Sequence, residues 1–102
     1  MNAGQLFWPQ MHAQPGETAQ QRTRLLPLYK VILHDDDVND MVYITFALMR
    51  AVGTLTLEEA ERIMLTAHLN GMAVVMVCPK ETAEYYQERL LSFKLTATIE
   101  PD

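Results

Sequence analysis

The apolar residues of this chain alternate between short strand-like runs and longer stretches of helical spacing. This alternation constrains the possible folds more than any other feature of the sequence. The run "LYKVIL" at residues 28–33 is rich in β-branched and aromatic side chains, which is typical of a strand. The continuous apolar run "MAVVMVC" at residues 72–78 predicts a buried strand, and "KLTATIE" at residues 94–100 alternates as a strand does. We therefore expect one small sheet.

The stretch "DMVYITFALMRAVG", residues 40–53, places apolar residues three or four positions apart, as one face of a helix requires. Asn39 or Asp40 can cap its first turn, because a short polar side chain can accept from the exposed backbone N–H groups there. Gly53 can end it.

The stretch "TLEEAERIMLTAHLNG" predicts a second helix with both ends marked. Thr56 and Glu59 form the T-x-x-E pattern of a capping box, and Asn70 and Gly71 are a stop signal. Residues 81–93 predict a third helix. The order β-α-α-β-α-β, with one small sheet that needs cover, indicates an α+β two-layer domain.

Composition narrows the class of protein. The chain has 102 residues, a net charge of −5 and one cysteine, Cys78. It therefore lacks the basic surface that nucleic acid requires and the cysteines of a disulfide framework or cysteine metal site. No signal peptide and no apolar run of membrane-spanning length stands out. We expect a cytoplasmic protein with no nucleic-acid or membrane partner.

Residues 1–26 are rich in glutamine and lack an apolar period, so they predict a flexible N-terminal tail. Residues 27–102 are long enough for a single core domain.

The run "HDDDVNDM" places four carboxylates directly after the first strand, and mutual repulsion makes such a cluster costly unless a cation relieves it. A metal, a basic partner and an amine are the candidates. A calcium loop fails, because Asp40 and Phe46 stand where that loop needs Gly and Glu. A solvated turn that caps the next helix accounts for part of the charge. His68 lies on an apolar face, where a buried structural histidine is the commoner interpretation.

The runs "YKVILHDDDVNDM", "IMLTAHLNG", "AVVMVC" and "LTATIE", in this order, resemble ClpS, the adaptor family that delivers N-degron substrates to the Clp protease. The resemblance covers roughly residues 28–100. It implies a three-stranded antiparallel sheet with three helices, and binding of proteins whose N-terminal residue is Leu, Phe, Tyr or Trp. It also implies a Clp AAA+ unfoldase as partner and no cofactor.

The resemblance further implies a set of site residues. The cation would be the α-ammonium group of the substrate, held by Asp35, Asp36, Asp37 and His68. The side-chain pocket and its rim would comprise Asn39, Met41, Ile44, Met64, Ala67 and Leu95. Docking to the unfoldase would involve Glu81 and the position of Tyr86.

Five of these positions depart from the family pattern. Asp35 replaces an Asn, Asn39 replaces a Thr, Ile44 and Ala67 replace Val, and Tyr86 replaces a Lys. Asp35 can no longer donate a hydrogen bond, because an ionised carboxylate is only an acceptor. The pocket is expected to be reshaped rather than lost.

The sequence thus predicts a non-enzymatic, monomeric adaptor for N-degrons. Two alternatives stay open. One is a specialised paralogue that inhibits or regulates the unfoldase without degron binding. The other is a metal-dependent hydrolase that uses the acidic loop.

Overall fold

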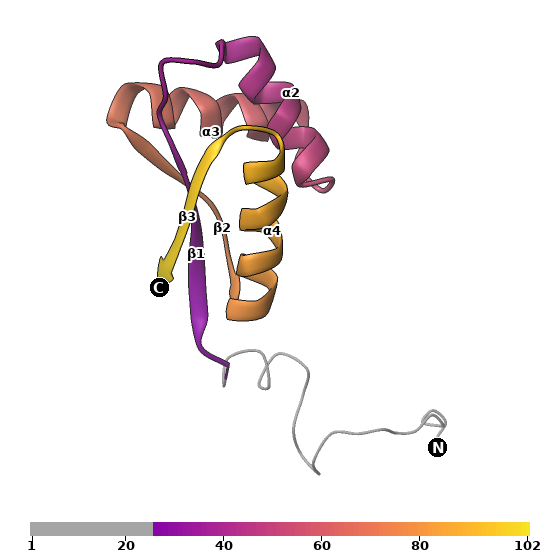
Figure 1. Cartoon of the computed structure of the whole chain (residues 1–102), viewed down its shortest axis with the longest axis vertical. Coiled ribbons are helices and arrows are strands. Elements are labelled where there is room, and N and C mark those ends of the chain that lie inside the picture. Colours follow the sequence, from indigo (N-terminus) through magenta and orange to yellow (C-terminus); the bar gives the residue numbers. More distant parts are fainter. Residues whose placement is uncertain (1–25) are drawn as a thin grey trace, which may run out of the picture.

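The computed structural model describes residues 26–102, which form three strands and three helices (Figure 1). In chain order the elements are β1 (Leu28–His34), α2 (Met41–Ala51), α3 (Leu57–Asn70), β2 (Met72–Pro79), α4 (Lys80–Ser92) and β3 (Thr96–Pro101). The predicted order β-α-α-β-α-β is confirmed. The predicted tail lies outside the described residues, apart from Leu26.

The sheet has the strand order β2-β1-β3, and both pairings are antiparallel. Val31 lies opposite Met76 on one side and Ile99 on the other. A register shift between Val31 and Ile32 marks a bulge in the ladder with β2. β1 is therefore the central strand, and the loop that follows it leaves from the middle of the sheet.

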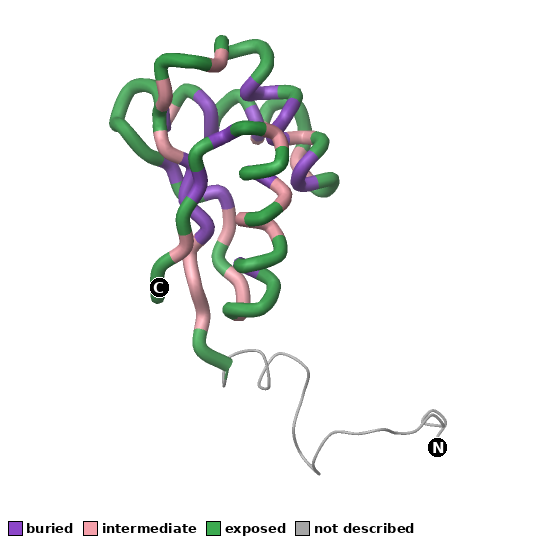
Figure 2. The backbone as a smooth tube through the Cα atoms, viewed as in Figure 1, coloured by how far each residue is buried: buried purple, intermediate pink, exposed green. Residues whose placement is uncertain are grey.

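The helices lie on one side of the sheet, and the core fills the space between the two layers (Figures 1 and 2). Val31 and Leu33 of β1 project into this core at 0% and 2% exposure. Leu48 of α2, Ala60 of α3 and Leu90 of α4 meet them, each with no exposed surface. Burial of these side chains, worth about 1.5–3 kcal/mol for each large one, fixes the helices on the sheet.

Asp40 caps α2, since its carboxylate accepts a hydrogen bond from the Tyr43 backbone N–H at 2.8 Å. The helix ends at Ala51 with Val52 as its C-cap, so Gly53 lies one residue beyond the cap. Of the described glycines only Gly71 has a positive φ. Gly53 therefore does not end the helix by a left-handed turn.

The predicted capping box of α3 is confirmed. Thr56 accepts from the Glu59 backbone N–H, and Glu59 accepts from that of Thr56. Hydrogen bonding by the Thr56 backbone N–H and side chain lowers the pKa of the Glu59 carboxyl. Gly71 closes the helix at φ 93°, a conformation that a side chain would strain. Its carbonyl accepts from the Asp35 N–H at 3.0 Å, which joins the end of α3 to the loop after β1.

Within residues 26–102, no helix has the length and apolar character needed to cross a membrane.

Candidate functional site

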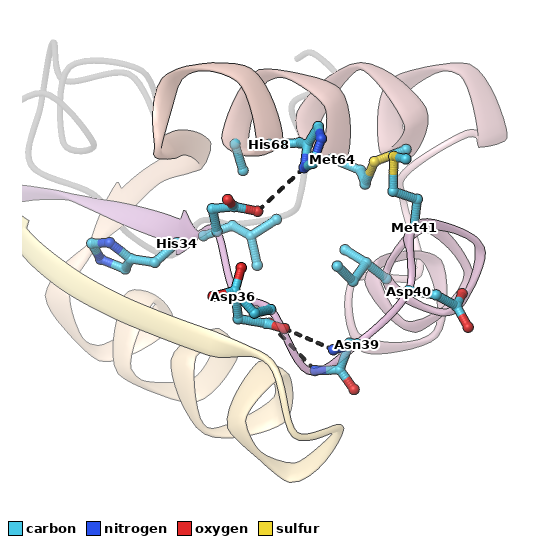
Figure 3. Close-up of a pocket in the computed structure, with 12 residues that line it drawn as sticks. His34, Asp36, Asn39, Asp40, Met41, Met64 and His68 are labelled. Carbon is cyan, nitrogen blue, oxygen red and sulfur yellow. Dashed lines mark hydrogen bonds and ion pairs between the residues drawn. The ribbon is translucent and has the colours of Figure 1, made fainter.

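A cavity of about 310 Å³ opens where β1 ends, between the loop after β1 and the helices α2 and α3 (Figure 3). Its walls come from two stretches of sequence, residues 33–44 and 64–68. The first stretch comprises the end of β1, the acidic loop and the first turn of α2, and the second belongs to the second half of α3. The lining residues are Leu33, His34, Asp35, Asp36, Asp37, Asn39, Asp40, Met41, Ile44, Met64, Ala67 and His68.

Asp36 holds the loop in its turn. One carboxylate oxygen accepts from the backbone N–H groups of Val38 and Asn39 at 2.9 and 2.8 Å, and the other accepts from the Asn39 side chain at 3.3 Å. Burial raises the pKa of Asp36, but the hydrogen bonds from Asn39 and Val38 outweigh it, so the pKa lies below its ordinary value. Asp36 is therefore firmly ionised near neutral pH.

Asn39 ties this loop to the turn before β3. Its side-chain amide donates to the Lys94 carbonyl at 2.9 Å as well as to Asp36. Close by, the Tyr43 hydroxyl donates to the Phe93 carbonyl. Lys94 has a φ of 69°, which is unusual for a residue with a side chain. The rim of the cavity is thus fastened to the end of α4.

Asp35 and His68 face one another across the rim (Figure 3). The His68 Nδ1 and an Asp35 carboxylate oxygen lie 3.6 Å apart, with side chains 51% and 33% exposed. This distance is too long for a good hydrogen bond but leaves both groups available to a third polar group between them.

The floor of the cavity is apolar. Ile44, Met64 and Ala67 are each at least nine-tenths buried, whereas Met41 at the first position of α2 is 45% exposed. None of the lining residues that the structure describes is Lys or Arg. The cavity therefore suits a ligand with an apolar body and a cationic end.

The structure brings together all the predicted substrate-binding residues except Leu95. Leu95 is 2% exposed, belongs to the hydrophobic core and does not line the cavity. Its N–H donates to the Leu90 carbonyl at the end of α4. The preceding residue of the same turn, Lys94, supplies the carbonyl that accepts from the Asn39 side chain.

Three lining residues were not predicted as part of the site. Leu33 could have been inferred, because the last inward-facing residue of a strand borders whatever follows it. Asp40 was identified only as a helix cap. His34 lines the edge of the cavity, but its ring points toward β3 (Figure 3), where Nε2 lies 2.7 Å from the Thr98 hydroxyl.

The two predicted docking residues do not share a face of α4. Glu81 is exposed, whereas Tyr86 is half-buried and packs against the core. Five residues along a helix correspond to about 140° of rotation, which turns the two side chains apart. Tyr85, 54% exposed and four residues from Glu81, is the tyrosine on the same side.

Within residues 26–102, no group of three or more His, Cys, Asp or Glu side chains is arranged to hold a metal ion.

Comparison with known proteins gives a consistent result. Residues 25–98 match the family model described as "ATP-dependent Clp protease adaptor protein ClpS". A ClpS adapter of Synechococcus elongatus is 45% identical over 89 residues, which cover 87% of this chain and 93% of that protein. A chloroplastic ClpS adapter of Chlamydomonas reinhardtii is 38% identical over 91% of this chain and 57% of its own length.

A solved structure is also similar. It is Agrobacterium tumefaciens ClpS2 bound to L-phenylalaninamide, with a TM-score of 0.69 and 33% identity, covering 74% of this chain and 98% of that one.

Proposed function

The chain belongs to the ClpS family of ATP-dependent Clp protease adaptor proteins, and from this membership we propose that its cavity binds the N-terminal residue of proteins marked for degradation. The residue would be Leu, Phe, Tyr or Trp, and the bound protein would pass to a Clp AAA+ unfoldase. The observation that carries the proposal is an apolar cavity whose rim holds Asp35 and His68 with further carboxylates.

An N-terminal residue offers the two groups that this cavity suits. Its α-ammonium group has hydrogen-bond donors and no acceptor, so it needs carboxylate or neutral imidazole acceptors. Its side chain needs an apolar enclosure, which Ile44, Met64 and Ala67 supply. L-Phenylalaninamide, the ligand of the Agrobacterium protein, likewise combines a free amine with an apolar side chain.

We assign different roles to the carboxylates on the rim. Asp36 already accepts three hydrogen bonds within the loop, so it positions its neighbours. Asp35, placed opposite His68, is the direct acceptor for the amine, and Asp37 adds charge beside it.

The interaction energies between the cavity and an N-terminal residue correspond to a moderate affinity, from which the ligand can dissociate. A hydrogen bond to a charged group contributes about 1.5–3 kcal/mol, and burial of one Leu or Phe side chain adds a similar amount. After the cost of association, this sum corresponds to a dissociation constant on the order of micromolar. Such an affinity suits a protein that must pass its ligand on.

The proposed role is binding rather than catalysis, and the family is described as one of adaptors. The cytoplasmic location stays a prediction, because chloroplastic proteins are among the similar relatives.

Fluorescence anisotropy with short labelled peptides tests the proposal. The peptides differ only at the first residue, which is Leu, Phe, Tyr, Trp, Ile, Ala or Arg. We expect micromolar binding of the first four and loss of binding when the Leu peptide is N-acetylated, because acetylation removes the ammonium group.

Failure of every peptide to bind would contradict the proposal and would favour a regulator of the unfoldase. A His68→Ala variant should bind the Leu peptide more weakly. The matched control is Leu69→Ala, since Leu69 is 76% exposed on the same helix and does not line the cavity.

A further inference from the structure

We infer that Met41 is an oxidation site, and that its conversion to the sulfoxide weakens ligand binding in the cavity. This inference rests on the proposed function. Met41 lines the cavity and is nevertheless 45% exposed, so its sulfur can be reached by a small oxidant. No other methionine among residues 26–102 combines these two properties.

Met64 is the informative comparison within the cavity. Its side chain points toward that of Met41 from the facing helix α3 (Figure 3), but it is only 8% exposed. Met72 is the informative comparison outside the cavity. It is 51% exposed at the start of β2, where it pairs with His34, and it does not line the cavity.

The chemistry needs a hydroperoxide as co-reactant. The thioether sulfur attacks one oxygen of hydrogen peroxide, an S–O bond forms, the O–O bond breaks, and the other oxygen leaves as water after proton transfer. The sulfur is oxidised by two electrons and the peroxide is reduced. Methionine sulfoxide reductase reverses the change.

The product changes the wall of the cavity from apolar to polar. A sulfoxide oxygen is a strong hydrogen-bond acceptor, and an incoming Leu or Phe side chain has no donor to offer it. Binding of the ligand must then remove water from that oxygen without supplying another hydrogen bond. We expect about a tenfold or greater loss of affinity from this cost.

The helix itself should survive. The Met41 carbonyl accepts a hydrogen bond from the Thr45 hydroxyl at 2.9 Å, and this backbone contact does not involve the sulfur. Oxidation is therefore expected to alter the cavity and to leave the fold unchanged.

The experiment uses the full chain, treated with graded amounts of hydrogen peroxide. Peptide mass spectrometry maps the added oxygen residue by residue, and anisotropy measures affinity for a peptide with N-terminal Phe. We expect Met41 to oxidise before Met64. The fraction of protein that binds with the original affinity should fall in proportion to the fraction of Met41 converted to sulfoxide. The two methionine sulfoxide reductases, one for each sulfoxide epimer, should together restore binding.

Two variants isolate the residue. Met41→Leu keeps the size of the wall and removes the sulfur, so its affinity should resist peroxide. Met72→Leu should remain as sensitive as the parent chain. Equal loss in Met41→Leu, oxidation of Met64 before Met41, or unchanged affinity at full Met41 oxidation would each overturn the inference. Absence of peptide binding before any treatment would instead overturn the proposed function, and the inference with it.

Discussion

At the scale of single residues, four aspartates in one short loop have four different surroundings. Asp40 caps α2, Asp36 accepts three hydrogen bonds within its turn, Asp35 faces His68, and Asp37 lies on the rim. The sequence predicts the cluster and its likeness to an amine site. It could not separate the roles, because they depend on which N–H groups the loop turns toward each carboxylate.

Asp36 should make the stability of the protein depend on acidity. Its pKa in the folded chain is lowered, so its stabilising contribution is present above about pH 4 to 5 and is lost as pH falls through the lowered pKa. Asp36→Ala should cost about 1 kcal/mol at pH 7, a small value because the side chain is partly in water. Urea unfolding from pH 7 to pH 3 measures both effects. An Asp36→Asn variant with the same acid dependence as the parent chain would contradict this assignment.

Lys94 should be replaceable by glycine with a gain in stability. Its φ of 69° costs a residue with a side chain roughly 1 kcal/mol, which glycine avoids. Because its carbonyl holds Asn39, the rim should stay in place. Thermal unfolding of Lys94→Gly should show a higher midpoint, whereas Glu84→Gly, within α4, should lower it.

At the scale of elements, the helices and strands were predicted to within one or two residues wherever local chemistry marks their ends. Thr56, Glu59 and Gly71 show this for α3. The differences from the expected site concern side-chain direction. Leu95 is buried in the core rather than in the cavity, and Tyr86 packs on the core while Tyr85 stays exposed. The local sequence does not show either burial, because each side chain's surroundings depend on how α4 lies on the sheet.

Arg89 should be important for joining α4 to α2. Its guanidinium donates to the Ala51 and Arg50 carbonyls, both at 2.8 Å, and so satisfies acceptors that the end of α2 leaves open. A lysine cannot reproduce two fixed donors, so Arg89→Lys should lower the free energy of unfolding by about 1–2 kcal/mol. Urea denaturation measures this. Arg62→Lys, at an exposed position on α3, is the control, and an equal effect there would exclude the specific role.

At the scale of the whole molecule, charge should help to bring the substrate to the cavity. The chain carries a net charge of −5, and four carboxylates surround the opening. Salt screens such attraction over about 10 Å at 0.1 M. Affinity for a Phe peptide should therefore fall several-fold between about 50 and 500 mM salt. An Asp37→Asn variant should show a weaker salt dependence, and an unchanged dependence would argue against electrostatic attraction by this residue.

The central position of β1 also decides how the molecule bears a mechanical load. The chain enters β1 at Leu28, and the cavity lies at the opposite end of the strand (Figures 1 and 3). Tension between these two points runs along the strand and loads the ladders with β2 and β3 in shear, so many hydrogen bonds must yield together. Tension between Leu28 and Asp102, which are hydrogen-bonded neighbours, would instead unzip β1 from β3 one bond at a time. The sheet should therefore resist tension between Leu28 and the cavity more strongly than tension that pulls Leu28 and Asp102 apart.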